Sequence, residues 1–80
     1  MNINSIKEKI ENSILNARVE VKDSTGTGDH FSVMVISNEF KNMSLVKRHQ
    51  LIYKSLNKYI TKEIHALQIK TYTEEELSNV

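Results

Sequence analysis

The chain has 80 residues with no cysteine and no proline, and its 11 basic and 10 acidic residues give a net charge of +1. This length excludes a two-domain enzyme with a cleft between its lobes, and the lack of thiols excludes a disulfide framework, a thiolate nucleophile and a cysteine-rich zinc site. The near-neutral charge predicts no strong attraction to nucleic acid or membrane, and no apolar run approaches the ~20 residues that span a bilayer, so we expect a single cytoplasmic domain over residues 1–80.

The first predicted element is a helix at about residues 4–17. Ser5 and Glu8 have the spacing of an N-terminal capping box. The apolar residues that follow share one helical face, and they are Ile3, Ile6, Ile10, Ile14 and Ala17.

Two strands joined by a glycine-bearing loop are predicted next. Residues 18–23 alternate between polar and apolar types, which indicates a strand with one wet face. Residues 30–36 are rich in β-branched and apolar types and predict a second strand, in which Phe31, Val33 and Val35 share a face. Both glycines of the chain lie in the loop at 24–29, which we expect to be a mobile hairpin loop that brings His30 to the surface.

A connector at 37–43 leads to a long helix at about 44–60, for which Ser44 is the expected N-cap. Its apolar side is predicted to contain Leu45, Ile52, Leu56, Tyr59 and Ile60. Residues 65–72 alternate again and predict a third strand. The capping-box spacing of Thr73 and Glu76 predicts a short last helix before a frayed tail at about 77–80.

The predicted fold class is α+β with the order α-β-β-α-β-α. If the second and third strands are neighbours, the right-handed crossover rule makes them parallel. The sheet would then be three-stranded and mixed, with the helices packed on one face.

Histidines are the residues with the clearest chemistry. His30 opens the second predicted strand and His65 the third, so parallel neighbouring strands would bring both imidazoles to one rim of the sheet. Two imidazoles are half of a four-ligand metal site, which a partner would have to complete. The competing interpretation is that these are ordinary strand-end histidines whose side chains point apart. His49 lies on the apolar side of the long helix and is interpreted as a structural residue, buried or half-buried and paired with backbone.

A basic stripe follows the long predicted helix. From Lys41 to Lys62 there are six basic residues and no acid. It could bind phosphates or an acidic partner, or it could simply be a solvated helix face. The candidate surface consists of Lys47, Arg48, Leu51, Lys54 and Lys58, with Leu51 expected to be exposed. Neither paired carboxylates at catalytic spacing nor a Ser-His-Asp arrangement is present, so we do not expect an enzyme.

Three blocks of sequence resemble the BolA family in order and spacing: GDHFSV at 28–33, SLVKRHQLIY at 44–53 after Phe40, and IHALQIKTYT at 64–73. The resemblance implies a fold similar to class II KH domains. It also implies a monothiol glutaredoxin as partner, with which such proteins share a bridging [2Fe-2S] cluster. The family's ligands are the His that opens the last strand and a Cys or His in or after the hairpin loop, positions held here by His65 and His30.

The same resemblance implies that glutaredoxin supplies its active-site Cys and glutathione a second thiolate. The isolated chain, a small member with His in its loop, is then expected to hold no cofactor and to be a monomer or weak homodimer. Because some members are described as transcriptional regulators, DNA binding through the basic 40–62 segment is the alternative, although the Gly-x-x-Gly loop of KH domains is missing. A third interpretation is a cluster-free adaptor that docks on glutaredoxin through the same segment.

Overall fold

The computed structural model describes residues 2–60 and 62–79. Its elements follow the predicted order: α1 (Ile3–Ser13), β1 (Arg18–Asp23), β2 (His30–Ile36), the short 3-10 helix η1 (Asn38–Phe40), α2 (Leu45–Ser55), β3 (Ala66–Tyr72) and α3 (Glu74–Ser78). α3 extends to Ser78 and so reaches into the stretch at about 77–80 that is predicted to be a frayed tail. Val80 lies outside the described residues.

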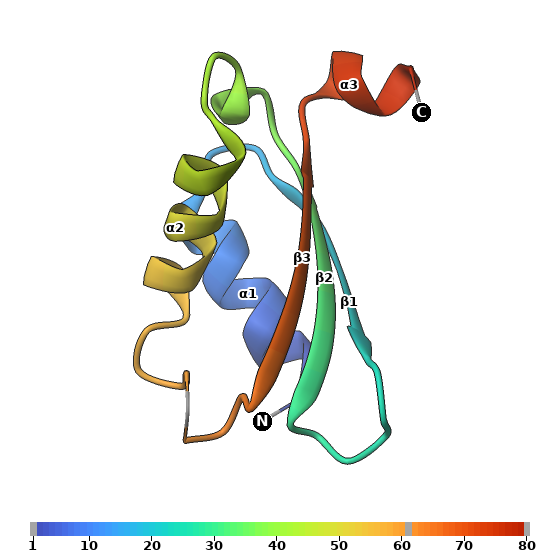
Figure 1. Ribbon diagram of the computed structural model, residues 1–80, viewed down its shortest axis with the longest axis vertical. Helices are drawn as coiled ribbons and strands as arrows, with labels where there is room; N and C mark the ends of the chain where they lie inside the picture. Colours follow the sequence, from blue (N-terminus) through green and yellow to red (C-terminus); the bar gives the residue numbers. More distant parts are fainter. Residues whose placement is uncertain (1, 61, 80) are drawn as a thin grey trace.

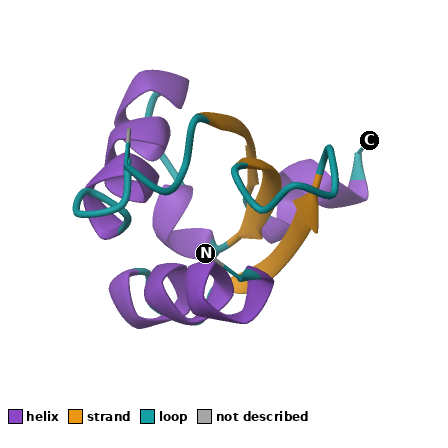
Figure 2. Cartoon of the chain, turned by 90° about the horizontal axis from the view of Figure 1, so that it is seen from below, coloured by secondary structure: helices purple, strands orange, loops and turns teal. Residues whose placement is uncertain are grey.

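The three strands form one mixed sheet in the order β1-β2-β3. β1 pairs antiparallel with β2, and β2 pairs parallel with β3, with His30 opposite Ala66 and Ile36 opposite Tyr72. Figures 1 and 2 show α1 and α2 on one face of this sheet, while α3 lies beyond the end of β3. The mixed sheet is therefore confirmed, with two of the three helices on its covered face.

The core lies between this covered face and the two long helices. Period-two alternation turns Phe31, Val33 and Val35 of β2 inward, where they are 0–2% exposed. α1 and α2 contribute the inward residues of their helical faces, which are Ile6, Ile10 and Ile52. Each such side chain contributes about 1.5–3 kcal/mol when fully buried, which fixes both helices to the sheet.

α1 is shorter than predicted and begins earlier. Its N-cap is Asn2, whose side chain accepts a hydrogen bond from the Ser5 N–H at 2.8 Å, so the predicted Ser5 cap is wrong. The helix ends at Ser13, and Asn16 adopts a left-handed conformation (φ 53°), which asparagine tolerates better than most residues. Ile14 stays buried in extended backbone, and for this reason the apolar spacing extends past the helix.

α2 begins where expected, since the Ser44 hydroxyl accepts a hydrogen bond from the Lys47 N–H at 3.2 Å. It ends at Ser55, five residues before the predicted end at about 60, and turns follow it. Leu56, Tyr59 and Ile60 still contact the core, so their spacing resembles that of a longer helix. Leu45, predicted on the apolar side, is 63% exposed, whereas Arg48, three residues later, is buried. Among the described residues, no helix has the length and apolar character needed to cross a bilayer.

Candidate functional site

His30 and His65 lie at the same end of the sheet because β2 and β3 are parallel and both begin there. His30 is the first residue of β2, and His65 immediately precedes β3. Their ring centroids are 6.3 Å apart, with an angle of 57° between the ring planes. The structure thus brings together the two imidazoles that the sequence predicts to share one rim.

Both imidazoles are accessible, with side-chain exposures of 42% for His30 and 57% for His65. Over residues 2–60 and 62–79, no group of three or more His, Cys, Asp or Glu side chains is arranged to hold a metal ion. Two imidazoles supply half of a four-ligand set. A metal ion or cluster held at this rim would therefore need donor atoms from another molecule.

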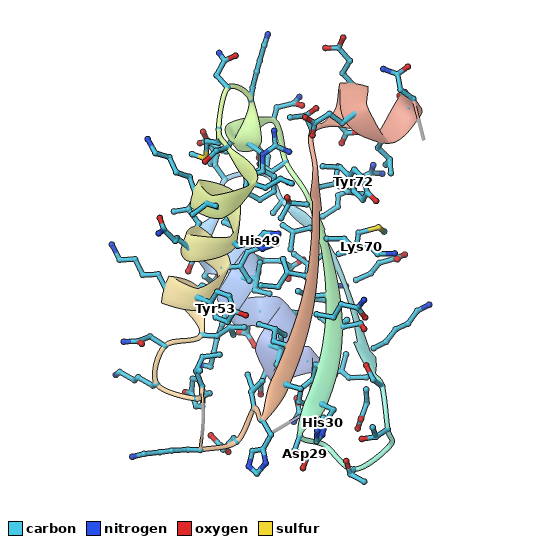
Figure 3. The ribbon with its side chains drawn as sticks, viewed as in Figure 1. Asp29, His30, His49, Tyr53, Lys70 and Tyr72 are labelled. Carbon is cyan, nitrogen blue, oxygen red and sulfur yellow. The ribbon has the colours of Figure 1, made fainter. Side chains whose placement is uncertain are left out.

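The carboxylate of Asp29 lies between the two rings. Its Oδ1 is 2.8 Å from Nδ1 of His30, and its Oδ2 is 3.9 Å from Nδ1 of His65. The Thr27 hydroxyl also donates a hydrogen bond to Oδ1. The hydrogen bond from Thr27 and then that of His30 hold the pKa of Asp29 below its ordinary value. Figure 3 shows Asp29 and His30 at the end of the sheet opposite Tyr72.

The loop that carries Asp29 is ordered by a second carboxylate. Asp23 accepts hydrogen bonds from the N–H groups of Gly26 and Gly28, both at 2.9 Å. These two residues have φ values of 75° and 77°, a left-handed conformation that glycine adopts without steric cost. The Ser24 N–H donates to the His30 carbonyl at 2.8 Å and closes the hairpin.

The sequence places Asp29 in the loop at 24–29 and does not predict that its carboxylate faces both imidazoles. An acid directly before His30 in the chain was the available signal, but it does not reveal that His65 lies beside the same carboxylate. Only the pairing of β2 with β3 places a residue 36 positions later at this point.

Arg48 corrects the predicted basic surface. Its side chain is 7% exposed and makes two hydrogen bonds to Glu76, at 2.6 and 3.0 Å. Its Nε donates to the Met43 carbonyl at 3.1 Å, and its guanidinium lies 5.6 Å from the centroid of the Phe40 ring. The prediction that Arg48 belongs to an exposed binding surface is therefore wrong, because helical spacing could not reveal an acidic partner 28 residues away.

The other basic side chains of the predicted surface are exposed to solvent. Lys47, Lys54 and Lys58 are exposed, whereas Leu51, expected to be exposed, is half-buried and packs against the core. A shallow hollow of about 300 Å³ on α2 is lined by Met43, Lys47, Gln50, Leu51 and Lys54.

His49 is half-buried near the middle of α2, which agrees with its predicted burial. Its ring makes no hydrogen bond to backbone among the described residues, so the predicted backbone pairing is not seen there. A partly exposed ring can bind water instead and needs no protein partner. Figure 3 places His49 far along the molecule from Asp29 and His30.

The sequence matches the family described as BolA-like protein over residues 2–76. It is similar to the DNA-binding transcriptional regulator BolA of Haemophilus influenzae, at 43% identity over 51 residues that make up 64% of this chain and 50% of that protein. The chain therefore matches half the length of that relative.

Two further similarities extend over most of the chain. The acid stress protein IbaG of Escherichia coli K12 is 38% identical over 74 residues, which are 91% of this chain and 84% of that protein. The solved structure of a bolA protein homologue from Coxiella burnetii has a TM-score of 0.81 and 33% identity, and the match covers 98% of this chain and 97% of that one. The printed names of these three relatives describe a transcriptional regulator, an acid stress protein and a bolA homologue, and none of them describes an enzyme.

Proposed function

The chain belongs to the BolA-like protein family, and from that premise we propose that it is an iron–sulfur cluster trafficking or regulatory partner that forms a [2Fe-2S]-bridged heterodimer with a monothiol glutaredoxin. One observation carries this proposal: two accessible imidazoles lie 6.3 Å apart, centroid to centroid, at one rim of the sheet. His65 and His30 are the ligands from this chain. The partner's active-site Cys and glutathione supply the thiolates.

The contacts of the rings support this assignment. Nδ1 of each ring faces Asp29, at 2.8 Å for His30 and 3.9 Å for His65. The Nε2 atoms have no hydrogen-bond partner within the described part of the chain. We therefore assign Nε2 of each ring as the atom that binds iron. Imidazole can replace thiolate on iron, as it does in Rieske centres.

The division of ligands has a consequence for where the cluster is held. This chain has no cysteine, so every thiolate in the shared site must come from another molecule. The heterodimer, rather than either protein alone, is therefore the unit that binds the cluster. This chain contributes two imidazole ligands, whose positions are set by the pairing of β2 with β3.

Reconstitution tests the proposal. The chain is mixed with a monothiol glutaredoxin, glutathione, iron and sulfide, and the visible absorption and circular dichroism spectra are recorded. We expect His65→Ala to change the cluster spectrum and to accelerate cluster loss, while His49→Ala, which alters a histidine away from the rim, leaves both unchanged. An unchanged spectrum and unchanged lability in His65→Ala would show that the proposed ligation is wrong.

DNA binding is a second candidate function, favoured by one specific similarity. A relative at 43% identity is named a DNA-binding transcriptional regulator, and this chain exposes Lys47, Lys54 and Lys58 on α2 and the turn after it. Arg48 is engaged by Glu76, so the lysines would make the phosphate contacts.

Titration of duplex DNA at two salt concentrations tests this second candidate. Each phosphate contact adds about 0.9 to the slope of log K against log salt, so Lys54→Ala should reduce the slope by about 1. Lys70→Ala, on β3 and away from α2, is the control and should leave the slope unchanged. Absence of binding at low salt would reject the candidate.

A further inference from the structure

We propose that Asp29 is the positioning residue for both imidazoles of the rim. Its carboxylate selects the ring orientation in which Nδ1 faces inward and Nε2 is left for a ligand, and its backbone carbonyl fixes the place of His65. The inference rests on the proposed function for what is bound at the rim. The orientation itself is a property of the chain alone.

The Asp29 carboxylate faces Nδ1 of both rings. Oδ1 of Asp29 lies 2.8 Å from Nδ1 of His30, which is hydrogen-bond distance, and this requires a proton on Nδ1 when the ring is neutral. Oδ2 of the same group is 3.9 Å from Nδ1 of His65, so this ring also directs its Nδ1 to Asp29. The Thr27 hydroxyl donates to Oδ1 and restrains the carboxylate. One acid therefore sets the direction of two rings that come from different strands.

The backbone of Asp29 also contacts the start of β3. The Asp29 carbonyl accepts a hydrogen bond from the His65 N–H at 2.7 Å and another from the Ala66 N–H at 3.3 Å. These bonds attach the start of β3 to the residue that also holds His30. The separation of the two rings is thus set at a single residue, whose own loop is ordered by Asp23 through Gly26 and Gly28.

The chemical value of this arrangement follows from how imidazole binds metals. A histidine that ligates through one nitrogen usually donates the other ring N–H to a carboxylate or carbonyl, which fixes the tautomer and makes the ligating nitrogen more basic. The Asp29 carboxylate is this hydrogen-bond partner for Nδ1 of His30 and lies 3.9 Å from Nδ1 of His65. Loss of such a partner typically costs about 10–100-fold in metal affinity.

The tautomer of the free chain is the primary test. Long-range 1H–15N correlation spectra of the histidine-labelled chain are recorded at about pH 8.5, about two units above the ordinary imidazole pKa. We expect His30 to be the Nδ1–H form, and Asp29→Ala to move it toward the Nε2–H form. Asp29→Asn keeps an acceptor oxygen and should retain more of the Nδ1–H form, with far-UV circular dichroism confirming that both variants fold.

Glu63→Gln is the matched control, because it removes an exposed carboxylate two residues from His65 that bonds to neither ring within the described residues. It should leave both tautomers unchanged. The proposal is overturned if His30 keeps its tautomer in Asp29→Ala, or if Glu63→Gln shifts it equally.

Cluster retention gives a second readout and separates the two proposals. In the reconstituted heterodimer, Asp29→Ala should lose its cluster to a chelator about 10–100-fold faster than the unmodified chain. If no variant forms a bridged complex, the proposed function fails and the tautomer result still decides the role of Asp29. If the complex forms and Asp29→Ala changes neither tautomer nor cluster loss, the positioning role fails and the function stands.

Discussion

Arg48 shows how one charged residue can join two distant elements. Its guanidinium is buried between α2 and α3, where it bonds to both carboxylate oxygens of Glu76 and to the Met43 carbonyl. Glu76 also accepts a hydrogen bond from the Thr73 N–H, so the same acid completes the capping box of α3. A buried charge that loses its partner is strongly destabilising. We infer that this ion pair holds α3 in place at the end of the sheet.

The pH dependence of stability tests this inference. The hydrogen bonds from Arg48, followed by that from the Thr73 backbone, lower the pKa of Glu76 from 4.5 to about 2. A carboxyl group whose pKa is lowered by folding stabilises the folded state above its ordinary pKa and loses that contribution as pH falls through the native value. We therefore expect the difference in Tm between the unmodified chain and Glu76→Gln to be full above about pH 5 and to disappear toward about pH 2.

Thermal unfolding followed by far-UV circular dichroism at steps of pH measures this difference. Glu75→Gln, which changes the neighbouring exposed acid on the same helix, is the control and should not reproduce the pH-dependent loss. A difference for Glu76→Gln that stays constant down to pH 2 would contradict the assigned role of the pair.

At the scale of elements, one face of α2 packs into the core and another is exposed to solvent. Ile52 is 0% exposed in the core, whereas Val46 on the same helix is 66% exposed. We expect Ile52→Ala to lower the free energy of unfolding by about 2–5 kcal/mol, because it leaves a cavity. Val46→Ala should change it by less than about 0.5 kcal/mol. Urea unfolding measures both, and equal effects would mean that α2 packs through another face.

The loop between β1 and β2 depends on backbone conformation. Gly26 has a φ of +75°, and a Cβ added there would meet nothing within 4 Å, so the cost of a side chain is conformational alone. We expect Gly26→Ala to lower the free energy of unfolding by about 1 kcal/mol. Urea unfolding against Asn57→Ala, an exposed position in the turn after α2, provides the comparison. Unchanged or increased stability of Gly26→Ala would show that the loop does not hold this conformation in solution.

The elements also show what the sequence could predict. The bounds of β1 and β2 match because alternating types and flanking polar residues mark both ends. The predictions made α1 and α2 too long because Ile14 and Leu56 contact the core from positions just beyond the helices, and apolar spacing indicates contact with the core rather than helix. The meeting of His30 and His65 followed from the crossover rule. Neither the contact of Asp29 with His65 nor the Arg48–Glu76 pair is predictable from the sequence, because the partners lie far apart along the chain and meet only in the folded structure.

At the scale of the whole molecule, the sheet serves as a support that presents two imidazoles at one end. The covered face, with its core between α1, α2 and the strands, leaves the rim free, since the His30 and His65 side chains remain 42% and 57% exposed. The exposed basic side chains Lys47 and Lys54 lie on α2 rather than on the sheet.

The most direct measurement of the central claim is pulsed electron paramagnetic resonance on the reduced heterodimer. Only this chain is labelled with 15N-histidine, while glutaredoxin and glutathione stay unlabelled. We expect strong nitrogen couplings that change when the histidines carry 15N. One component of these couplings should be lost in His65→Ala, and all of them should persist in His49→Ala. Couplings that are the same with and without the label would show that no imidazole of this chain binds the cluster, and the proposed function would be wrong.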